Sequence, residues 1–257
     1  MNFHSINVPI YFVFMGMAWG LGYELSLLVL KLKMLSNKRF MGLFAGTFLS
    51  SWIGSKAFFL IFSSGTNFLI HLSSLDFWLG GGFVFFGGLL FGGTFIYFYC
   101  LIFKKFNIFS LYCVLPAICF SHAVGRIGCF FSGCCFGKIC NLPLNIFLFD
   151  GGRHPVQLYE SLFLLFLGAF LTIKILKEKN KTLKENFYYF LSIYLISYAI
   201  FRFFNEFLRG DNIRGIIFGL STSQFISLSL IFITLIVLLK DNIKLNKKVF
   251  NLEKIKN

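Results

Sequence analysis

The stretch GIIFGLSTSQFISLSLIFITLIVLL, residues 215–239, contains no charged side chain over its 25 positions. About 20 apolar residues suffice to cross the ~30 Å hydrocarbon core of a bilayer as an α-helix, and they exceed what a barrel strand needs. Six more apolar stretches occur, at residues 8–30, 40–62, 78–103, 108–124, 155–176 and 187–207. The pattern predicts an all-α integral membrane protein with about seven transmembrane helices.

The composition supports the same fold class. Of the 257 residues, 57% are hydrophobic, only 13% are charged, and 39 are phenylalanine. A water-soluble fold cannot bury so much apolar side chain, so the composition excludes a soluble enzyme, a disordered protein and a disulfide-stapled secreted domain. The segments between the apolar stretches are short and show no internal repeat, which predicts a single polytopic transmembrane domain over residues 1–257.

The net charge of +14 is spread between the apolar stretches, and no single basic patch suggests nucleic acid as a partner. With the N-terminus outside, 17 of the 24 Lys and Arg residues fall in inner loops. The positive-inside rule therefore predicts an outer N-terminus and a cytoplasmic C-terminus. Residues 1–9 contain no Lys or Arg, so no cleaved signal peptide is expected. Five basic residues fall on the outer side: Arg126, Lys138, Arg153, Arg209 and Arg214.

The sixth span carries three charged residues on one face. Arg202, Glu206 and Arg209 are spaced i, i+4 and i+7. Because an ionised side chain within a span costs ~2.5–3.5 kcal/mol on insertion scales, the three need partners or a function. Two interpretations stay open: a structural ion pair between Arg202 and Glu206, and a guanidinium clamp on a phosphate group.

Two outer segments carry further polar groups. In GRIGCFFSGCCFG, residues 125–137, glycines surround Arg126, which predicts irregular backbone whose amides hold an anionic head group together with that arginine. The segment RHPVQLYE, residues 153–160, opens the fifth span with several polar side chains. Within it His154 is either an ordinary interfacial residue or an acid–base group.

The glycines and cysteines leave alternatives open. Gly87 and Gly88 in the third span permit either close helix packing or close approach of a lipid. Four of the seven cysteines fall within 12 positions on the outer side, where disulfides can form: Cys129, Cys134, Cys135 and Cys140. Their spacing is not the C-x₂-C repeat of a zinc site, so no metal is expected.

Three motifs together resemble the prolipoprotein diacylglyceryl transferase family: GRIG at 125–128, RHPVQLYE at 153–160 and RFFNEFLR at 202–209. Tyr11, Gly54-Ser55-Lys56 and the glycine-rich start of the third span also match. The resemblance implies a multi-pass enzyme of the bacterial inner (plasma) membrane. Its implied reaction transfers diacylglycerol from phosphatidylglycerol, a membrane lipid, to the thiol of the lipobox cysteine in a prolipoprotein signal peptide. No cofactor is implied.

The resemblance and the placement of the polar residues along the spans together suggest roles for individual residues. The expected catalytic residues are His154, Arg126, Arg202, Glu206 and Arg209. The expected substrate-binding residues are Arg126, Lys56, Tyr11, Gly87, Gly88, Gln157, Tyr159 and Glu160. The arginines would bind the lipid phosphate and stabilise charge on the leaving group, and His154, or else His122, would accept the proton of the thiol.

The chain departs from the family motif at several positions. Phe86 stands where the motif has a histidine, Cys129 where it has an asparagine, and Lys56 where it has an arginine. Ser132-Gly133-Cys134 replaces an Asn-Gly-Glu run. Two other functions therefore stay open on the same scaffold: a membrane thiol-redox protein that uses Cys134 and Cys135, and a lipid-binding protein without catalysis.

The charge asymmetry of the loops yields a testable topology. A cysteine introduced near Lys179 should be shielded from a membrane-impermeant thiol reagent in intact cells, whereas one near Asn67 should react. The parental chain with its native cysteines is the control. The reverse labelling pattern would overturn the predicted orientation.

Overall fold

The structure of the protein, a computed structural model, describes residues 10–62, 77, 85–103, 106–140, 152–210, 216–217 and 219–256. This part of the chain is nearly all helical, and it confirms the predicted all-α membrane fold class. Six of its helices are long and apolar enough to cross a membrane: Ile10–Leu32, Phe40–Ile61, Ile108–Phe131, Val156–Lys177, Leu183–Leu208 and Thr222–Leu239. A further apolar helix, Gly87–Ile102, is shorter.

The described residues form two compact units. The first unit contains helix α1 (Ile10–Leu32) as far as Val29, together with the described elements from Leu111 onward. The second contains the described residues between Leu30 and Ser110. That residues 1–257 act as a single domain stays a prediction, as does the orientation of the termini.

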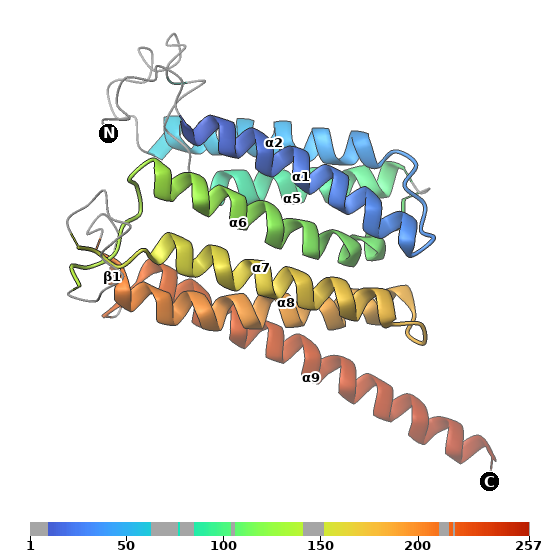
Figure 1. The fold of residues 1–257 in the computed structure, drawn as a ribbon. Coiled ribbons are helices and arrows are strands. Elements are labelled where there is room, and N and C mark those ends of the chain that lie inside the picture. The colour runs from blue at the N-terminus through green and yellow to red at the C-terminus, as the bar shows by residue number, and fades with distance from the viewer. Residues whose placement is uncertain are drawn as a thin grey trace. The chain divides into compact units, whose positions relative to one another are not determined.

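In the first unit, three helices run side by side: α6 (Leu115–Phe131), α7 (Val156–Lys177) and α8 (Leu183–Asn205) (Figure 1). The helix α9 (Thr222–Lys256) packs against α8. The short elements are the 3₁₀ helix η3 (Ile108–Val114), whose first three residues belong to the second unit, the 3₁₀ helix η5 (Glu206–Leu208), and the antiparallel strands β1 (Ile216–Ile217) and β2 (Leu220–Ser221).

Helix α7 packs against α6 on one side and α8 on the other. At Gly168 a Cβ atom would lie only 3.1 Å from Cys119 of α6, so the absence of a side chain lets the two helices approach. Toward α8, the ring of Phe163 stacks on that of Phe201 with centroids 4.2 Å apart. These contacts set the positions of the helix ends that carry the predicted site residues.

The start of α8 is set by a capping box. The side chain of Thr182 accepts a hydrogen bond from the backbone N–H of Glu185, and the Glu185 carboxylate accepts one from the N–H of Thr182 at 2.8 Å. Such a cap satisfies N–H groups that the first helical turn leaves without partners. It therefore fixes where the helix begins and which face its later residues present.

The irregular backbone predicted for residues 125–137 is wrong for its first half, because α6 continues as a regular helix to Phe131. Gly128 serves packing instead: a Cβ atom there would lie 2.6 Å from the Cβ of Phe14 in α1, and Phe14 stacks on Phe131. Irregular backbone begins only after the helix, where Gly133 adopts a φ of +65°.

The segment after α6 is held between the start of α7 and the end of α8. The N–H of Lys138 donates to the carbonyl of Leu208 at 2.8 Å, and the N–H of His154 donates to the carbonyl of Lys138 at 2.9 Å. A Cβ atom at Gly137 would lie 2.4 Å from the carbonyl oxygen of His154. This close backbone approach brings residues 134–140 next to Arg209.

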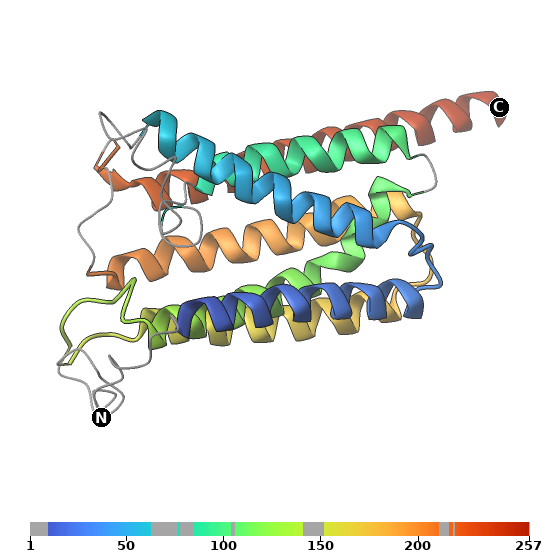
Figure 2. The ribbon, with the colours of Figure 1, turned by 90° about the horizontal axis from the view of Figure 1, so that it is seen from above.

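In the second unit, α2 (Phe40–Phe62) packs closely against α5 (Phe85–Ile102), and Figure 2 shows the two helices crossing. Gly54 and Gly87 form the point of closest approach. A Cβ atom at Gly54 would lie 2.5 Å from the carbonyl oxygen of Gly87, and one at Gly87 would lie 2.3 Å from that of Gly54. Small residues at such a crossing let two helix backbones meet.

The substitution Gly54→Ala should destabilise the protein by about 1–3 kcal/mol, the usual cost of overpacking. The matched control is Gly93→Ala, because a Cβ atom at Gly93 in α5 meets nothing within 4 Å. Thermal unfolding in detergent measures both. A melting temperature for Gly54→Ala equal to that of Gly93→Ala would contradict the assigned crossing point.

Candidate functional site

The predicted site residues of the first unit meet at Glu160, whose side chain is only 1% exposed. Its Oε1 accepts a hydrogen bond from the Tyr198 hydroxyl at 2.8 Å and lies 3.0 Å from Nη2 of Arg126. The same oxygen is 3.6 Å from Nε2 of His122, and Oε2 is 3.6 Å from Nη1 of Arg202. One carboxylate of α7 therefore links side chains of α6 and α8.

The ion pairs continue along the end of α8. Nη2 of Arg202 lies 2.8 Å from Oε2 of Glu206, and Nε of Arg209 lies 4.0 Å from the same oxygen. Nη2 of Arg202 also donates to Ser223 Oγ in α9 at 3.3 Å. The predicted pair of Arg202 and Glu206 is therefore present, and it belongs to a larger group.

We call Arg126, Arg202, Arg209, Glu160 and Glu206 the arginine network. Its three guanidinium groups and two carboxylates together carry one net positive charge. Two of its donors, Nε of Arg126 and Nη1 of Arg202, are buried and have no hydrogen-bond partner in the described part of the chain. Because a buried donor without an acceptor is costly, the network suits a bound anion that supplies acceptor oxygens.

The two histidines lie in different surroundings. Nδ1 of His154, the predicted base, is 3.4 Å from the hydroxyl of Tyr159. Among the described residues, no ion pair joins His154 to the arginine network. His122, by contrast, contacts Glu160 and places its ring 5.5 Å from that of Tyr198. The structure therefore brings His122, and not His154, to the network.

Two other predicted residues lie beside the segment that follows α6. The side chain of Gln157 is buried, and its Nε2 donates to the carbonyl of Cys134 at 2.7 Å. Tyr11 in α1 interacts electrostatically with Arg126 and with the thiols of Cys129 and Cys134. Gln157 thus supports the backbone near the cysteines. Tyr11 lies near both Arg126 of the arginine network and the thiols of Cys129 and Cys134.

Three predicted substrate-binding residues belong to the second unit. Lys56 is fully buried, donates to the carbonyl of Phe77 and lies 4.6 Å from the centroid of its ring. Gly87 and Gly88 face α2, where a Cβ atom at Gly88 would lie 3.2 Å from the carbonyl oxygen of Ser51. For the glycines this geometry favours the helix-packing alternative. The side chain of Phe86 lies outside the described residues.

Sequence reasoning missed two residues of the site. Tyr198 precedes Arg202 by four residues on α8, so the same i, i+4 rule that singled out Glu206 also indicates this tyrosine. Ser223 comes from α9, and no local pattern in the sequence links it to Arg202.

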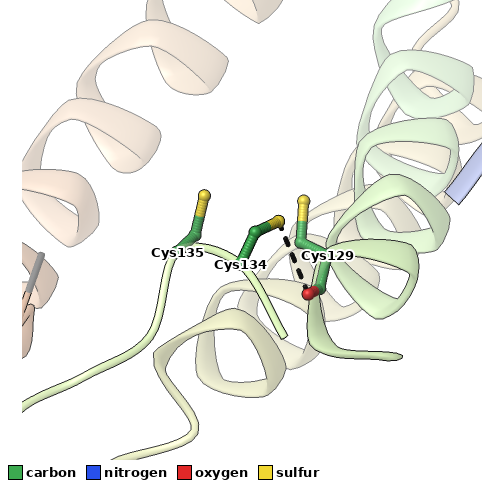
Figure 3. A group of neighbouring side chains, drawn as sticks. All are labelled: Cys129, Cys134 and Cys135. Carbon is green, nitrogen blue, oxygen red and sulfur yellow. Dashed lines mark hydrogen bonds between the residues drawn. The ribbon is translucent and has the colours of Figure 1, made fainter. Parts of the chain in front are cut away.

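A second polar group forms where α6 ends. The sulfur atoms of Cys129, Cys134 and Cys135 all lie within 4.8 Å of one another, and Figure 3 shows the thiols side by side. Cys129 is buried, Cys134 is exposed and Cys135 is half-buried; Cys140 lies outside this group. Cys129, Cys134 and Cys135 are free thiols. The fold thus assembles three thiols that their sequence spacing did not indicate as a site.

The three thiols differ in acidity. Hydrogen bonds with Cys129 and Cys134, together with the nearby Arg209 guanidinium, hold the pKa of the Cys135 thiol below its ordinary value. Hydrogen bonds with Cys129 and Cys135 raise the pKa of Cys134. The Arg209 guanidinium beside Cys135 favours the thiolate form of that side chain.

Comparison with known proteins places this site in a family. The family model of prolipoprotein diacylglyceryl transferase matches residues 1–240. A phosphatidylglycerol–prolipoprotein diacylglyceryl transferase of Clostridium tetani is 38% identical over 169 residues, which cover 62% of this chain and 64% of the relative. The protein of that name from Finegoldia magna is 30% identical over 242 residues, 92% of each chain. The chain belongs to the prolipoprotein diacylglyceryl transferase family.

Proposed function

We propose that this protein transfers the diacylglyceryl group of phosphatidylglycerol to the thiol of a lipobox cysteine in a prolipoprotein. It acts as a multi-pass enzyme of the bacterial inner membrane. Support comes from the family membership and from the relatives that carry the name of this transferase. The helices of membrane-spanning length support a substrate that resides in the bilayer.

The observation that carries the proposal is a pair of buried donors, Nε of Arg126 and Nη1 of Arg202, that make no hydrogen bond within the described part of the chain, in a network of three guanidinium groups and two carboxylates. A phosphodiester carries one negative charge and several acceptor oxygens, which match these donors. When the carbon–oxygen bond breaks, a second negative charge develops on the departing glycerol phosphate. Fixed guanidinium groups stabilise that charge more in the transition state than in the ground state.

The chemistry requires a thiolate, because the thiol itself is a poor nucleophile. The sulfur of the lipobox cysteine attacks the carbon of the diacylglyceryl group that is bonded to the phosphate oxygen. A thioether forms, and glycerol phosphate leaves. In this account Arg126, Arg202 and Arg209 bind the phosphate, while Glu160 and Glu206 orient the guanidinium groups.

The group of three free thiols favours one rival function, a thiol-redox protein that uses Cys134 and Cys135. Purified protein incubated with phosphatidylglycerol and a lipobox peptide distinguishes the two. A thioether-linked diacylglyceryl peptide, detected by mass spectrometry, supports the transferase. Reversible thiol oxidation without any such product would replace the proposed function with the redox one.

Replacing Arg202 with lysine should lower kcat/KM for phosphatidylglycerol about 100- to 1,000-fold, the usual effect of losing a charge-stabilising donor. An ammonium group preserves the charge but not the planar fork that contacts Glu160, Glu206 and a phosphate together. The matched control is Arg39→Lys, whose guanidinium lies over the Phe103 ring in the second unit. If Arg202→Lys turned over like this control, charge alone would suffice and the clamp would be wrong.

Replacing His122 with glutamine should lower turnover about 100-fold, whereas His154→Gln should have a smaller effect. We assign the larger role to His122 because it contacts Glu160, the carboxylate on which the arginines converge. The acidic limb of the pH–rate profile should change in His122→Gln and persist in His154→Gln. The opposite result would restore His154 as the histidine that acts in the reaction.

A further inference from the structure

The three-thiol group is built by a tight turn at the end of α6. The N–H of Cys134 donates to the carbonyl of Cys129 at 3.2 Å, so the chain folds back directly after the helix. Gly133 and Cys135 adopt φ angles of +65° and +61°, and a φ in this region is uncommon for cysteine. This turn brings thiols five and six positions apart in sequence into one cluster (Figure 3).

The spacing of the sulfur atoms suits a tetrahedral metal ion. With Zn–S bonds of about 2.3 Å, the sulfurs of a tetrahedral site lie roughly 3.8 Å apart. Separations of up to 4.8 Å therefore require only small side-chain rotations to close around an ion. Thiolates select soft or borderline cations such as Zn²⁺, and three protein ligands leave the fourth position open, as in catalytic zinc sites.

The surroundings of the cluster provide positive charge. Three thiolates and one Zn²⁺ ion carry one net negative charge, which is costly in a partly buried place unless cations lie near. The Arg209 side chain hydrogen-bonds to Cys135, and Arg126 interacts electrostatically with both Cys129 and Cys135. The same two arginines belong to the arginine network, so the cluster adjoins the place proposed for the phosphate.

We propose that Cys129, Cys134 and Cys135 bind a Zn²⁺ ion whose open fourth position takes the thiol of the acceptor peptide. This inference rests on the proposed transferase function. The acceptor thiol releases its proton to water when its sulfur binds the ion, because a coordinating thiol is deprotonated. The bound thiolate attacks the carbon of the diacylglyceryl group that is bonded to the phosphate oxygen of phosphatidylglycerol. A C–S bond forms, the C–O bond breaks, its electron pair stays on the departing glycerol phosphate, and the ion is unchanged.

The exposure of Cys134 fits this role, because an incoming thiol needs access to the ion. Arg126 and Arg209 would then flank both partners of the reaction, the thiolate on the ion and the phosphate in the network.

The first test measures metal binding to the full-length protein in detergent. Zn²⁺ titrated against a chromophoric chelator should bind with a single equivalent. Cys134→Ala and Cys135→Ala should weaken binding by more than the ~10–100-fold that loss of an outer partner of a metal ligand causes. The control is Cys100→Ala in α5, outside the cluster. Zn²⁺ affinity of Cys134→Ala equal to that of the native chain would overturn the site.

The second test examines the fourth position with Co²⁺ in place of Zn²⁺. Its thiolate charge-transfer absorption should shift when a lipobox peptide is added, and should not shift with the same peptide carrying serine in place of cysteine. Metal-stripped protein should lose turnover and regain it with Zn²⁺. Unchanged turnover after stripping would refute the metal inference and leave the transferase function intact.

The same experiments also identify the case in which the metal site is present but the proposed transferase function is wrong. If the cysteine peptide shifts the Co²⁺ spectrum but no condition yields a lipidated product, the metal site stands and the proposed function fails. If the thiols oxidise reversibly and bind neither ion, the cluster is a redox centre and the metal inference is wrong.

Discussion

The contact on which the site depends is the Glu160 carboxylate, buried among Arg126, Arg202, His122 and Tyr198. A lone carboxylate at this depth would be strongly unfavourable, and so would the lone guanidinium groups beside it. The carboxylate and the guanidinium groups therefore each lower the free-energy cost of burying the other. Because the partners come from α6 and α8, the carboxylate of α7 also fixes the register in which these three helices pack.

The positive and negative charges of the arginine network are unequal in number. Arg202 reaches both Glu160 and Glu206, and Glu206 in turn approaches Arg209, yet three cations still face two anions. Two buried N–H donors make no hydrogen bond among the described residues. A network optimised for stability alone would satisfy such donors, whereas a site preorganised for a phosphate keeps them available. The excess of one guanidinium group in the network thus supports the proposed binding of a phosphate.

Local patterns in the sequence were sufficient for part of this description. Hydropathy predicted the helices, and the i, i+4, i+7 spacing placed Arg202, Glu206 and Arg209 on one face. Neither pattern identified Glu160 as the centre, because its partners lie on other helices and meet it only through tertiary packing. Glycine content at 125–137 predicted irregular backbone throughout, but the helix continues to Phe131, and Gly128 allows Phe14 of α1 to approach it.

The cysteine cluster likewise could not be predicted from local sequence patterns. Their spacing in the chain did not indicate a ligand set, since the cluster depends on positive φ angles at Gly133 and Cys135 and on backbone pairing of Gly137 with Arg209. The polar residues around His154 at the start of a span likewise predicted it as the base, whereas the packing of α6 brings His122 to Glu160. Side chains four residues apart on one helix were predictable, and contacts between helices were not.

The most direct test of this account is the turnover of Glu160→Gln with phosphatidylglycerol and a lipobox peptide, together with its melting temperature in detergent. The amide keeps the shape of the side chain and removes the charge that positions the arginines. The account predicts a protein that still folds, with a lower melting temperature, and whose turnover falls by at least about 100-fold. The control is Glu24→Gln on the exposed face of α1. A folded Glu160→Gln protein with the turnover of this control would contradict the central role of the carboxylate.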